Sequence, residues 1–430
     1  MKNAPHRLPG LVLEKHWFDL PLDYAHPDRK IRVFVREVVA PGKESADLPC
    51  LVFFQGGPGF GSPRPVTNSG WIKRALQDYR VLLLDQRGTG LSSSVTAQSL
   101  RSIGDARAQA EYLRHFRSDN IVRDAEAIRR QLVGDRPWSI LGQSYGGFCA
   151  LRYLSASPEG LKEALITGGI PSLTASADDV YRATYRRVAE KNRAYYERYP
   201  DDAGRVIKIA HHLLEHDVRM PGGGRLTAQR FQMLGLQFGM SDGFEAIHYL
   251  VEDAFIEPAG GGAREINWNF LFHLDQLQAF DTNPIYALLQ EACYAQQSAT
   301  RWSAERLRVE FPEFDPARHD RVLFTGEMIY PWMFDAHPQL QPLKEAAEIL
   351  AQDESWPQLY DAGRLARNKV PVAAAVYFDD MYVHREFSEE TSRAVSNMKL
   401  WITNQYEHNA LRADGEAVVG RLLQMVRGEA

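Results

Sequence analysis

The chain has 430 residues, a formal net charge of −5 at pH 7 and a hydrophobic content of 44%. Its basic residues are scattered, so it lacks the clustered positive charge that binding to nucleic acid or to an anionic membrane requires. Its three cysteines do not form a disulfide framework, and no apolar run is long enough to span a bilayer. We therefore expect a cytoplasmic protein with a large packed core and no nucleic-acid or membrane partner.

The first 170 residues alternate strand and helix signals, as a mostly parallel sheet with crossover helices requires. Residues 121–132 repeat apolar side chains at helical spacing and should cross over to the next strand. The expected strands are Ile31–Val39, Cys50–Phe54, Val81–Leu84, Trp138–Leu141 and Leu165–Gly168.

From about Pro171 to Leu365 the strand signals disappear, and helical stretches such as Tyr181–Tyr199 and Ala304–Phe311 replace them. Two glycine-rich loops, Pro221–Gly224 and Pro258–Gly262, look like mobile connections between helices. This change of pattern predicts a helical insertion, or cap, over residues 171–366.

The strand pattern resumes at Val372–Phe378 and Lys399–Thr403, and a closing helix is expected from about Gly415 to Val426. The α/β core is therefore expected to be split, with residues 1–170 and 367–430 on either side of the cap. We find no internal repeat.

The motif Gly142-Gln143-Ser144-Tyr145-Gly146 places a serine where an apolar strand meets a helix. The flanking glycines allow a tight turn that holds the serine in a strained conformation with its hydroxyl exposed. This context predicts a nucleophile elbow with Ser144 as the nucleophile.

In folds with this elbow, the acid and the histidine follow the nucleophile along the chain, each after a later strand. Asp379 and Asp380 end the strand Val372–Phe378, and His408 follows the last strand. His408 would take the Ser144 proton, and an aspartate would hold its imidazole. The residues alone do not decide between the two aspartates. His384 is the competing histidine, but it lies only four residues after Asp380.

The turn Gly56-Gly57-Pro58-Gly59 follows a buried strand and has two functional interpretations. The glycine patterns of phosphate-binding loops are absent, which disfavours a phosphate cradle. An oxyanion hole fits better, with the backbone N–H groups of Gly57 and Tyr145 as donors. A plain structural turn is the alternative.

Residues His212-Leu213-Leu214-Glu215-His216 match the H-x-x-E-H pattern of inverted zinc peptidases. They lie in the inserted helices, and no acidic ligand further along the chain stands out. We favour a polar helix face and expect neither a metal nor an organic cofactor.

Five segments make the chain resemble the proline iminopeptidases, an α/β-hydrolase family of serine exopeptidases. They are residues 56–59, Asp85-Gln86-Arg87-Gly88-Thr89-Gly90, residues 142–147, Asp380-Met381-Tyr382-Val383 and Glu407-His408-Asn409. The size of the chain and the cap segments at 324–327 and 331–334 are similar to the larger form of that enzyme. One departure is Gln55, where many members have a histidine.

The resemblance implies an α/β-hydrolase core that releases N-terminal proline from small peptides, with Asp380 as the acid. It also implies that cap glutamates bind the substrate ammonium. Glu327 is the first candidate and Glu291 the second, with Glu245 and Glu252 as weaker alternatives. Apolar side chains suited to the pyrrolidine ring are Trp332, Phe334 and Phe148. An esterase or amidase and a non-catalytic binding protein are the competing functions, and the oligomeric state stays open.

Overall fold

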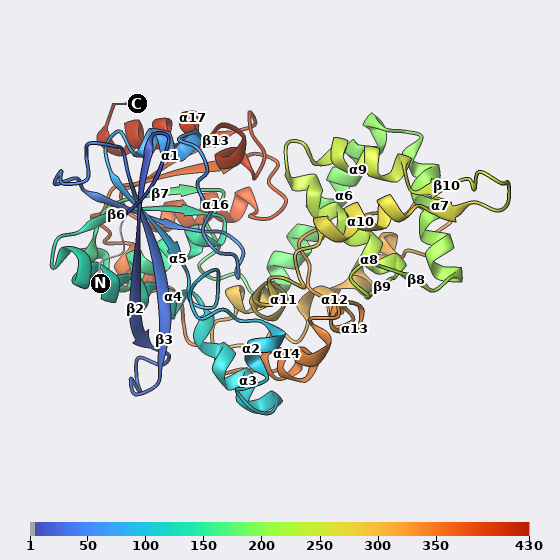
Figure 1. Cartoon of the computed structure of the whole chain (residues 1–430), viewed down its shortest axis with the longest axis horizontal. Coiled ribbons are helices and arrows are strands. Elements are labelled where there is room, and N and C mark those ends of the chain that lie inside the picture. The colour runs from blue at the N-terminus through green and yellow to red at the C-terminus, as the bar shows by residue number, and fades with distance from the viewer. Residues whose placement is uncertain (1–4, 430) are drawn as a thin grey trace.

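The computed structural model describes residues 5–429, and a nine-stranded sheet forms the left part of the molecule in Figure 1. The strand order is β1-β2-β3-β5-β4-β6-β7-β12-β13. The pairs up to β3·β5 are antiparallel, and every later pair is parallel. The strands are β1 His6–Leu8, β2 Leu11–Pro21, β3 Lys30–Val39, β4 Cys50–Phe54, β5 Arg80–Asp85, β6 Trp138–Gln143, β7 Leu161–Thr167, β12 Val372–Tyr377 and β13 Met398–Thr403.

Both faces of the sheet are covered, which explains why its central strands are continuous apolar runs. Side chains alternate along a strand, so Phe53 enters one hydrophobic core and Phe54 the other. The Phe53 core contains residues of α1 and α17, and the Phe54 core contains residues of α4 and α5. The helices of this part are α1 Gly70–Ala75, α2 Ala97–Leu100, α3 Ala106–Leu113, α4 Ser118–Val133, α5 Tyr145–Ala156, α16 Arg385–Ala394 and α17 Ala410–Arg427.

Residues 168–371, between β7 and β12, form the mainly helical right part of Figure 1 and the region below its centre. The boundary expected at residue 170 lies three residues after β7 ends, and the one at 366 lies six residues before β12 begins. The helices are α6 Ala177–Arg198, α7 Asp202–Glu215, α8 Ala228–Gln232, α9 Gly243–Glu252, α10 Trp268–Leu277, α11 Pro284–Leu289, α12 Ser303–Leu307, α13 Met333–Ala336, α14 Lys344–Ala351 and α15 Ala362–Leu365.

The cap, in which no strand signal was found, also contains short strands. Two short antiparallel ribbons, β8 Val218–Arg219 with β9 Arg225–Leu226 and β10 Phe255–Ile256 with β11 Glu265–Ile266, flank the two glycine-rich loops. Each strand has only two residues, too few to produce a period-two pattern in the sequence. The glycine-rich loops are therefore the turns of hairpins, which lie between α7 and α8 and between α9 and α10 along the chain.

The closing helix begins five residues earlier than expected. Helix α17 starts at Ala410 and contains a non-helical residue, Asp414, with φ −147°. At Gly415 a Cβ atom would lie 2.9 Å from the Trp71 backbone nitrogen, so glycine allows α17 to pack closely on α1. The kink interrupts the helical period and hides the first turn from sequence analysis.

No helix within residues 5–429 combines the length and apolar character needed to cross a membrane.

Candidate active site

Ser144 lies between the last residue of β6 and the first residue of α5, with φ 53° and ψ −123°. This left-handed conformation is strained for a residue with a side chain. It is held by a hydrogen bond from the Ser144 amide to the Thr167 carbonyl at 3.0 Å. A Cβ on Gly146 would collide with the Phe54 carbonyl, and one on Gly147 with the Gly169 carbonyl. The glycines therefore let α5 begin directly against the sheet, as the elbow requires.

His408 and Asp380 form a buried pair after strands β13 and β12. The His408 Nδ1 atom lies 2.8 Å from Asp380 Oδ2. The other carboxylate oxygen accepts hydrogen bonds from the amides of Tyr382 at 2.8 Å and Val383 at 3.1 Å. These contacts fix the carboxylate, which in turn orients the imidazole.

Burial by itself lowers the pKa of His408, but the charge and hydrogen bond of Asp380 raise it above its ordinary value. Smaller contributions in the same direction come from Glu327 and Glu407. The site thus favours the imidazolium form that general-base chemistry would generate.

Asp379 and His384, the competing acid and histidine from the sequence, have other partners. Asp379 is half-exposed and pairs with Arg187, with 3.1 Å between Oδ1 and Nη1. His384 precedes α16, and its Nδ1 atom lies 2.6 Å from Glu386. Of the two aspartates, Asp380 is therefore the one that contacts His408.

The segment Thr167-Gly168-Gly169 links the serine to the histidine. A Cβ on Gly168 would lie 3.1 Å from His408 Nδ1, and a Cβ on Gly169 would overlap with the Ser144 carbonyl. Ser144 and His408 therefore approach the same three residues at the carboxyl end of β7.

The turn after β4 lies against both the serine and the cap. A Cβ on Gly56 would lie 2.9 Å from Ser144 Cβ, and one on Gly59 would lie 2.8 Å from Ile285 Cβ in α11. Gly57 itself has φ 128°, which side chains disfavour. Tyr145 is the first residue of α5, so its N–H has no carbonyl one turn back to bind. Tyr145 thus follows Ser144 directly, and Gly57 follows the glycine that faces the Ser144 side chain.

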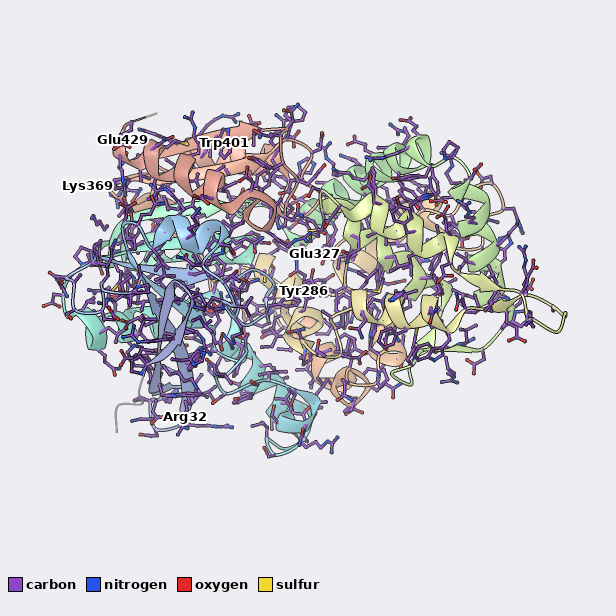
Figure 2. All side chains as sticks on the ribbon, turned by 45° about the horizontal axis from the view of Figure 1, so that its top comes forward. Arg32, Tyr286, Glu327, Lys369, Trp401 and Glu429 are labelled. Atoms are coloured by element: carbon purple, nitrogen blue, oxygen red, sulfur yellow. The ribbon has the colours of Figure 1, made fainter. Side chains whose placement is uncertain are left out.

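Glu327 lies beside Tyr286 at the centre of the molecule, between the sheet-containing part and the cap (Figure 2). The Tyr286 hydroxyl donates a hydrogen bond of 2.5 Å to Glu327 Oε1. Burial raises the pKa of Glu327 to about 7, which the Tyr286 hydrogen bond and the charge of His408 partly oppose. A Cβ on the preceding residue, Gly326, would lie 3.0 Å from the Met381 methyl carbon, so Glu327 lies beside the loop that carries Asp380.

Several tyrosines surround Glu327. Burial first, and then the charge of Glu327, raises the pKa of the phenols of Tyr286, Tyr294 and Tyr382. The Tyr382 ring also lies 4.5 Å from the His408 ring, measured between centroids. Sequence analysis assigned no role to any of these tyrosines, although Tyr382 lies in the segment 380–383 that carries the family resemblance.

Glu291 is buried, but its carboxylate is engaged by the cap itself. Its oxygens accept hydrogen bonds from the amides of Ser303 at 3.1 Å and Ala304 at 3.0 Å, the first residues of α12. Burial raises the pKa of Glu291 to about 6, which these hydrogen bonds oppose. This geometry gives Glu291 a helix-capping role.

Two of the three aromatic residues predicted for the proline ring lie in the cap. Phe334 is completely buried and packs edge-on against Trp302, with 5.7 Å between ring centroids. Trp332 is partly buried and stacks on Tyr330 at 5.4 Å. Phe334 is thus a core residue of the cap, because none of its surface is available to a ligand. Phe148, by contrast, contacts Tyr145 of the elbow, with centroids 5.9 Å apart.

The H-x-x-E-H segment does not form a cluster of metal ligands. The His212 and His216 rings stack at 4.1 Å, and His216 Nδ1 lies 3.0 Å from the His212 carbonyl oxygen. Within residues 5–429, the one group of three ligand atoms close enough to share a metal belongs to Glu14, His16 and Glu37. The Arg80 guanidinium already pairs with Glu37 there.

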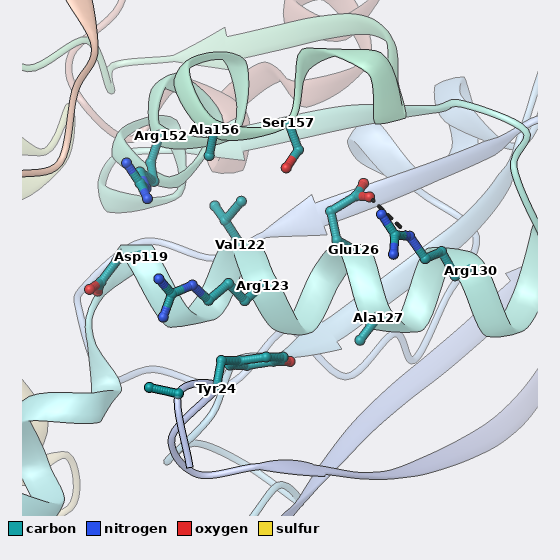
Figure 3. Close-up of a pocket in the computed structure, with 11 residues that line it drawn as sticks. Tyr24, Asp119, Val122, Arg123, Glu126, Ala127, Arg130, Arg152, Ala156 and Ser157 are labelled. Carbon is teal, nitrogen blue, oxygen red and sulfur yellow. Dashed lines mark ion pairs between the residues drawn. The ribbon is translucent and has the colours of Figure 1, made fainter. Parts of the chain in front are cut away.

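A pocket of about 560 Å³ lies between α4 and the C-terminal half of α5 (Figure 3). Its charged lining includes Arg123, Arg152 and the pair Glu126–Arg130, at 3.8 Å. Arg152 lies more than two helical turns beyond Ser144 along α5. This pocket is therefore separate from the site around Ser144.

The sheet order and the serine elbow define an α/β hydrolase, and residues 49–254 match the family model described as the alpha/beta hydrolase fold. A proline iminopeptidase of Aeromonas sobria is 51% identical over 422 residues, covering 98% of each chain. One of Aspergillus aculeatus is 37% identical over 98% of this chain and 95% of its own. The solved proline iminopeptidase of Mycobacterium smegmatis has a TM-score of 0.46 at 13% identity, covering 96% of this chain and 98% of that one. The chain belongs to the proline iminopeptidase family.

Proposed function

We propose that this enzyme releases N-terminal proline from small peptides through an acyl-enzyme intermediate on Ser144. The observation that carries the proposal is the position of a partly buried carboxylate, Glu327, which accepts a hydrogen bond from Tyr286 and follows Gly326, whose added Cβ would lie 3.0 Å from Met381 beside Asp380. Such a carboxylate distinguishes a charged N-terminus from a neutral amide by a charge-assisted hydrogen bond. Membership of the family supports the same activity.

The chemistry follows from the three residues. Ser144 Oγ attacks the prolyl carbonyl carbon while His408 accepts the hydroxyl proton, and Asp380 holds the imidazole and stabilises its cation. The amides of Gly57 and Tyr145 donate hydrogen bonds to the developing oxyanion. When the C–N bond breaks, His408 gives its proton to the leaving amine. Water, activated by the same histidine, then hydrolyses the prolyl ester and regenerates Ser144.

Substrate recognition is assigned to the cap side of the site. Glu327 accepts hydrogen bonds from the prolyl ammonium, and Tyr286 keeps its carboxylate oriented. The pyrrolidine ring would pack against aromatic side chains around this pair. Phe60, which follows the oxyanion turn, contacts the Tyr286 ring with 5.3 Å between centroids, and Phe148 contacts the Tyr294 ring at 5.9 Å.

The proposal also places the enzyme in the cytoplasm. Its three cysteines are free and buried, as expected in a reducing compartment.

Glu327→Gln is expected to remove substrate recognition while leaving the catalytic triad intact. Losing one partner of a charge pair in a partly desolvated site typically costs about 2–5 kcal/mol, or roughly 30- to 4,000-fold in kcat/KM. We would measure kcat/KM for a prolyl arylamide beside the rate at which a fluorophosphonate probe labels Ser144. The first should fall, and the second should stay close to that of the wild type.

Glu291→Gln is the comparison for this experiment. Because Glu291 binds the first amides of α12, its substitution should lower Tm. The ratio of kcat/KM to the labelling rate should stay close to that of the wild type. If Glu327→Gln lowers both rates together, Glu327 is structural. If it changes neither, the ammonium is held elsewhere, and the Glu291 variant shows whether that carboxylate binds it.

The pH dependence should differ between charged and neutral substrates. Glu327 has a pKa of about 7, so below that pH its carboxyl becomes neutral and loses its attraction for the prolyl ammonium. Activity toward the prolyl arylamide should therefore fall more steeply on the acid side than activity toward p-nitrophenyl acetate. Only the protonation of His408, whose pKa is also raised, should limit the ester.

The measurement is kcat/KM from about pH 5 to about pH 9 for both substrates, in the wild type and in Glu327→Gln. In the variant the two acid limbs should coincide. Identical acid limbs in the wild type would remove Glu327 from amine recognition.

A further inference from the structure

One turn of cap helix α6 contacts the residues that immediately precede both the acid and the base. Arg187 Nη1 lies 3.1 Å from Asp379 Oδ1, and Asp379 is the residue before Asp380. The Arg187 side chain is largely buried, with 15% of its surface exposed, and it also pairs with Glu190 at 2.7 Å. The acid loop is thus connected to the cap by an ion pair one residue from the catalytic carboxylate.

Lys191 makes the matching contact with the histidine loop. Its Nζ atom lies 2.6 Å from Glu407 Oε1, and Glu407 is the residue before His408. Arg187 and Lys191 are four residues apart, so they project from the same face of α6. Two cations on one helical turn therefore hold the acid loop and the histidine loop, which come from different strands.

The same turn of α6 contacts the segment that carries Glu327. A Cβ on Gly326 would lie 2.5 Å from a methyl group of Val188. Asn192 accepts a hydrogen bond from the Phe324 amide at 2.8 Å and donates one to the Phe324 carbonyl at 2.9 Å. Residues 187–192 of α6 thus meet all three segments that supply Asp380, His408 and Glu327.

The Lys191–Glu407 ion pair is more buried than an ion pair on the protein surface. The Lys191 side chain is 9% exposed and the Glu407 side chain 30%, and Glu407 Oε2 is buried without a hydrogen-bond partner among residues 5–429. An exposed pair constrains its neighbours little, whereas removal of one member of a desolvated pair leaves an uncompensated charge. Lys191 thus holds the Glu407 carboxylate, one residue before His408.

A second cap segment supports the histidine loop through hydrogen bonds. The His408 amide donates to the Gly239 carbonyl at 3.1 Å. Asn409 accepts from the Ser241 amide at 3.0 Å and donates to the Ser241 hydroxyl at 3.1 Å. The histidine loop is thus held from the cap side at three consecutive residues, Glu407, His408 and Asn409.

We propose that Arg187 and Lys191 are positioning residues, through which cap helix α6 sets the places of Asp380 and His408 relative to Glu327. The cap then restricts access to the site and also aligns Asp380 and His408 with Glu327, which binds the substrate amine. The alignment with Glu327 rests on the proposed function, whereas the positioning of Asp380 and His408 does not.

The test is the kinetics of Lys191→Met, Glu407→Gln and the double variant. Displacement of His408 should lower kcat for a prolyl arylamide roughly tenfold to a hundredfold in Lys191→Met, with KM within about twofold of the wild type. Fluorophosphonate labelling should slow in parallel, because it also needs His408. Lys191→Arg should restore most of the rate. The double variant, which leaves no unpaired charge, should lose less than the product of the two single losses.

Arg182→Met is the matched control on the same helix. Arg182 pairs with Glu310 inside the cap through two hydrogen bonds of 2.9 Å and contacts neither triad loop. It should keep wild-type kcat and labelling, while Arg187→Met should resemble Lys191→Met. Circular dichroism and Tm identify a variant that fails to fold, and Glu407→Gln then carries the test, since it preserves side-chain volume.

Two outcomes would overturn the proposal: wild-type kcat and labelling in folded Lys191→Met, or losses in the double variant equal to the product of the single losses. Failure of the proposed function gives a different result. The wild type would then not hydrolyse prolyl arylamides. The labelling rate of Lys191→Met relative to that of the wild type would still show whether Lys191 positions His408.

Discussion

Replacing Ser144 by alanine is expected to lower kcat at least about 10³-fold while the fold stays intact. The partly exposed hydroxyl lies at the start of α5, so its loss leaves no cavity in the core. The strained backbone at φ 53° is held by the Thr167 carbonyl and by the neighbouring glycines, not by the hydroxyl. Turnover of a prolyl arylamide, covalent labelling by a fluorophosphonate and Tm should be measured on the same preparation.

Ser102→Ala provides the control, because that serine is exposed and its hydroxyl only donates to the Ser99 carbonyl at 2.9 Å. It should keep wild-type turnover and labelling. If folded Ser144→Ala retains most of its activity, Ser144 is not the nucleophile, and the acyl-enzyme mechanism loses its basis.

The sheet could be predicted from the sequence because its buried strands leave a strong local signal. Cys50–Phe54 has the predicted bounds, and the strands near residues 81, 138 and 372 differ from prediction by one or two residues at their ends. Strand β2 was missed, because the partly or fully exposed residues 14–17 interrupt its apolar run. Local pattern thus identifies strands buried on both faces better than strands at the antiparallel edge.

Part of the site could be predicted from chain order alone. A serine at an elbow and a histidine after the last strand are recognised by their place in the fold. The choice between Asp379 and Asp380 depends on how the backbone turns after β12, which adjacent identical residues do not reveal. The structure directs Asp380 to His408 and Asp379 to Arg187.

The cap residues were harder to rank because raised pKa values alone do not separate them. Burial raises the pKa of both Glu327 and Glu291, although Glu291 is buried and Glu327 is only partly buried. They differ in their partners, a tyrosine hydroxyl for Glu327 and two helix amides for Glu291. Those partners are distant in sequence or depend on where α12 begins, so no local motif encodes them.

Asp380→Asn is expected to be far more damaging than Asp379→Asn. The carboxylate of Asp380 selects the tautomer with hydrogen on Nδ1, which leaves the other ring nitrogen free to accept the Ser144 proton. An amide in its place can offer a hydrogen to Nδ1 and favour the opposite tautomer, and it cannot stabilise the imidazolium. We expect a loss in kcat on the order of 10³- to 10⁴-fold. Asp379→Asn removes the pair with Arg187 but leaves the Asp380 carboxylate on His408, so its loss should match the roughly tenfold to hundredfold loss expected for Arg187→Met.

His408→Ala should lower kcat about as much as Ser144→Ala, and combining the two should add little, because the members of such a triad act as a unit. The experiment compares kcat for a prolyl arylamide in these variants and in the two aspartate variants, with Tm as the measure of folding. Asp380→Asn requires that check most, since its carboxylate also accepts the amides of Tyr382 and Val383. If kcat falls more in Asp379→Asn than in a folded Asp380→Asn, Asp379 is the acid of the triad and Asp380 is not. Independent, multiplicative losses in Ser144→Ala and His408→Ala would mean that the two residues do not share one proton-transfer step.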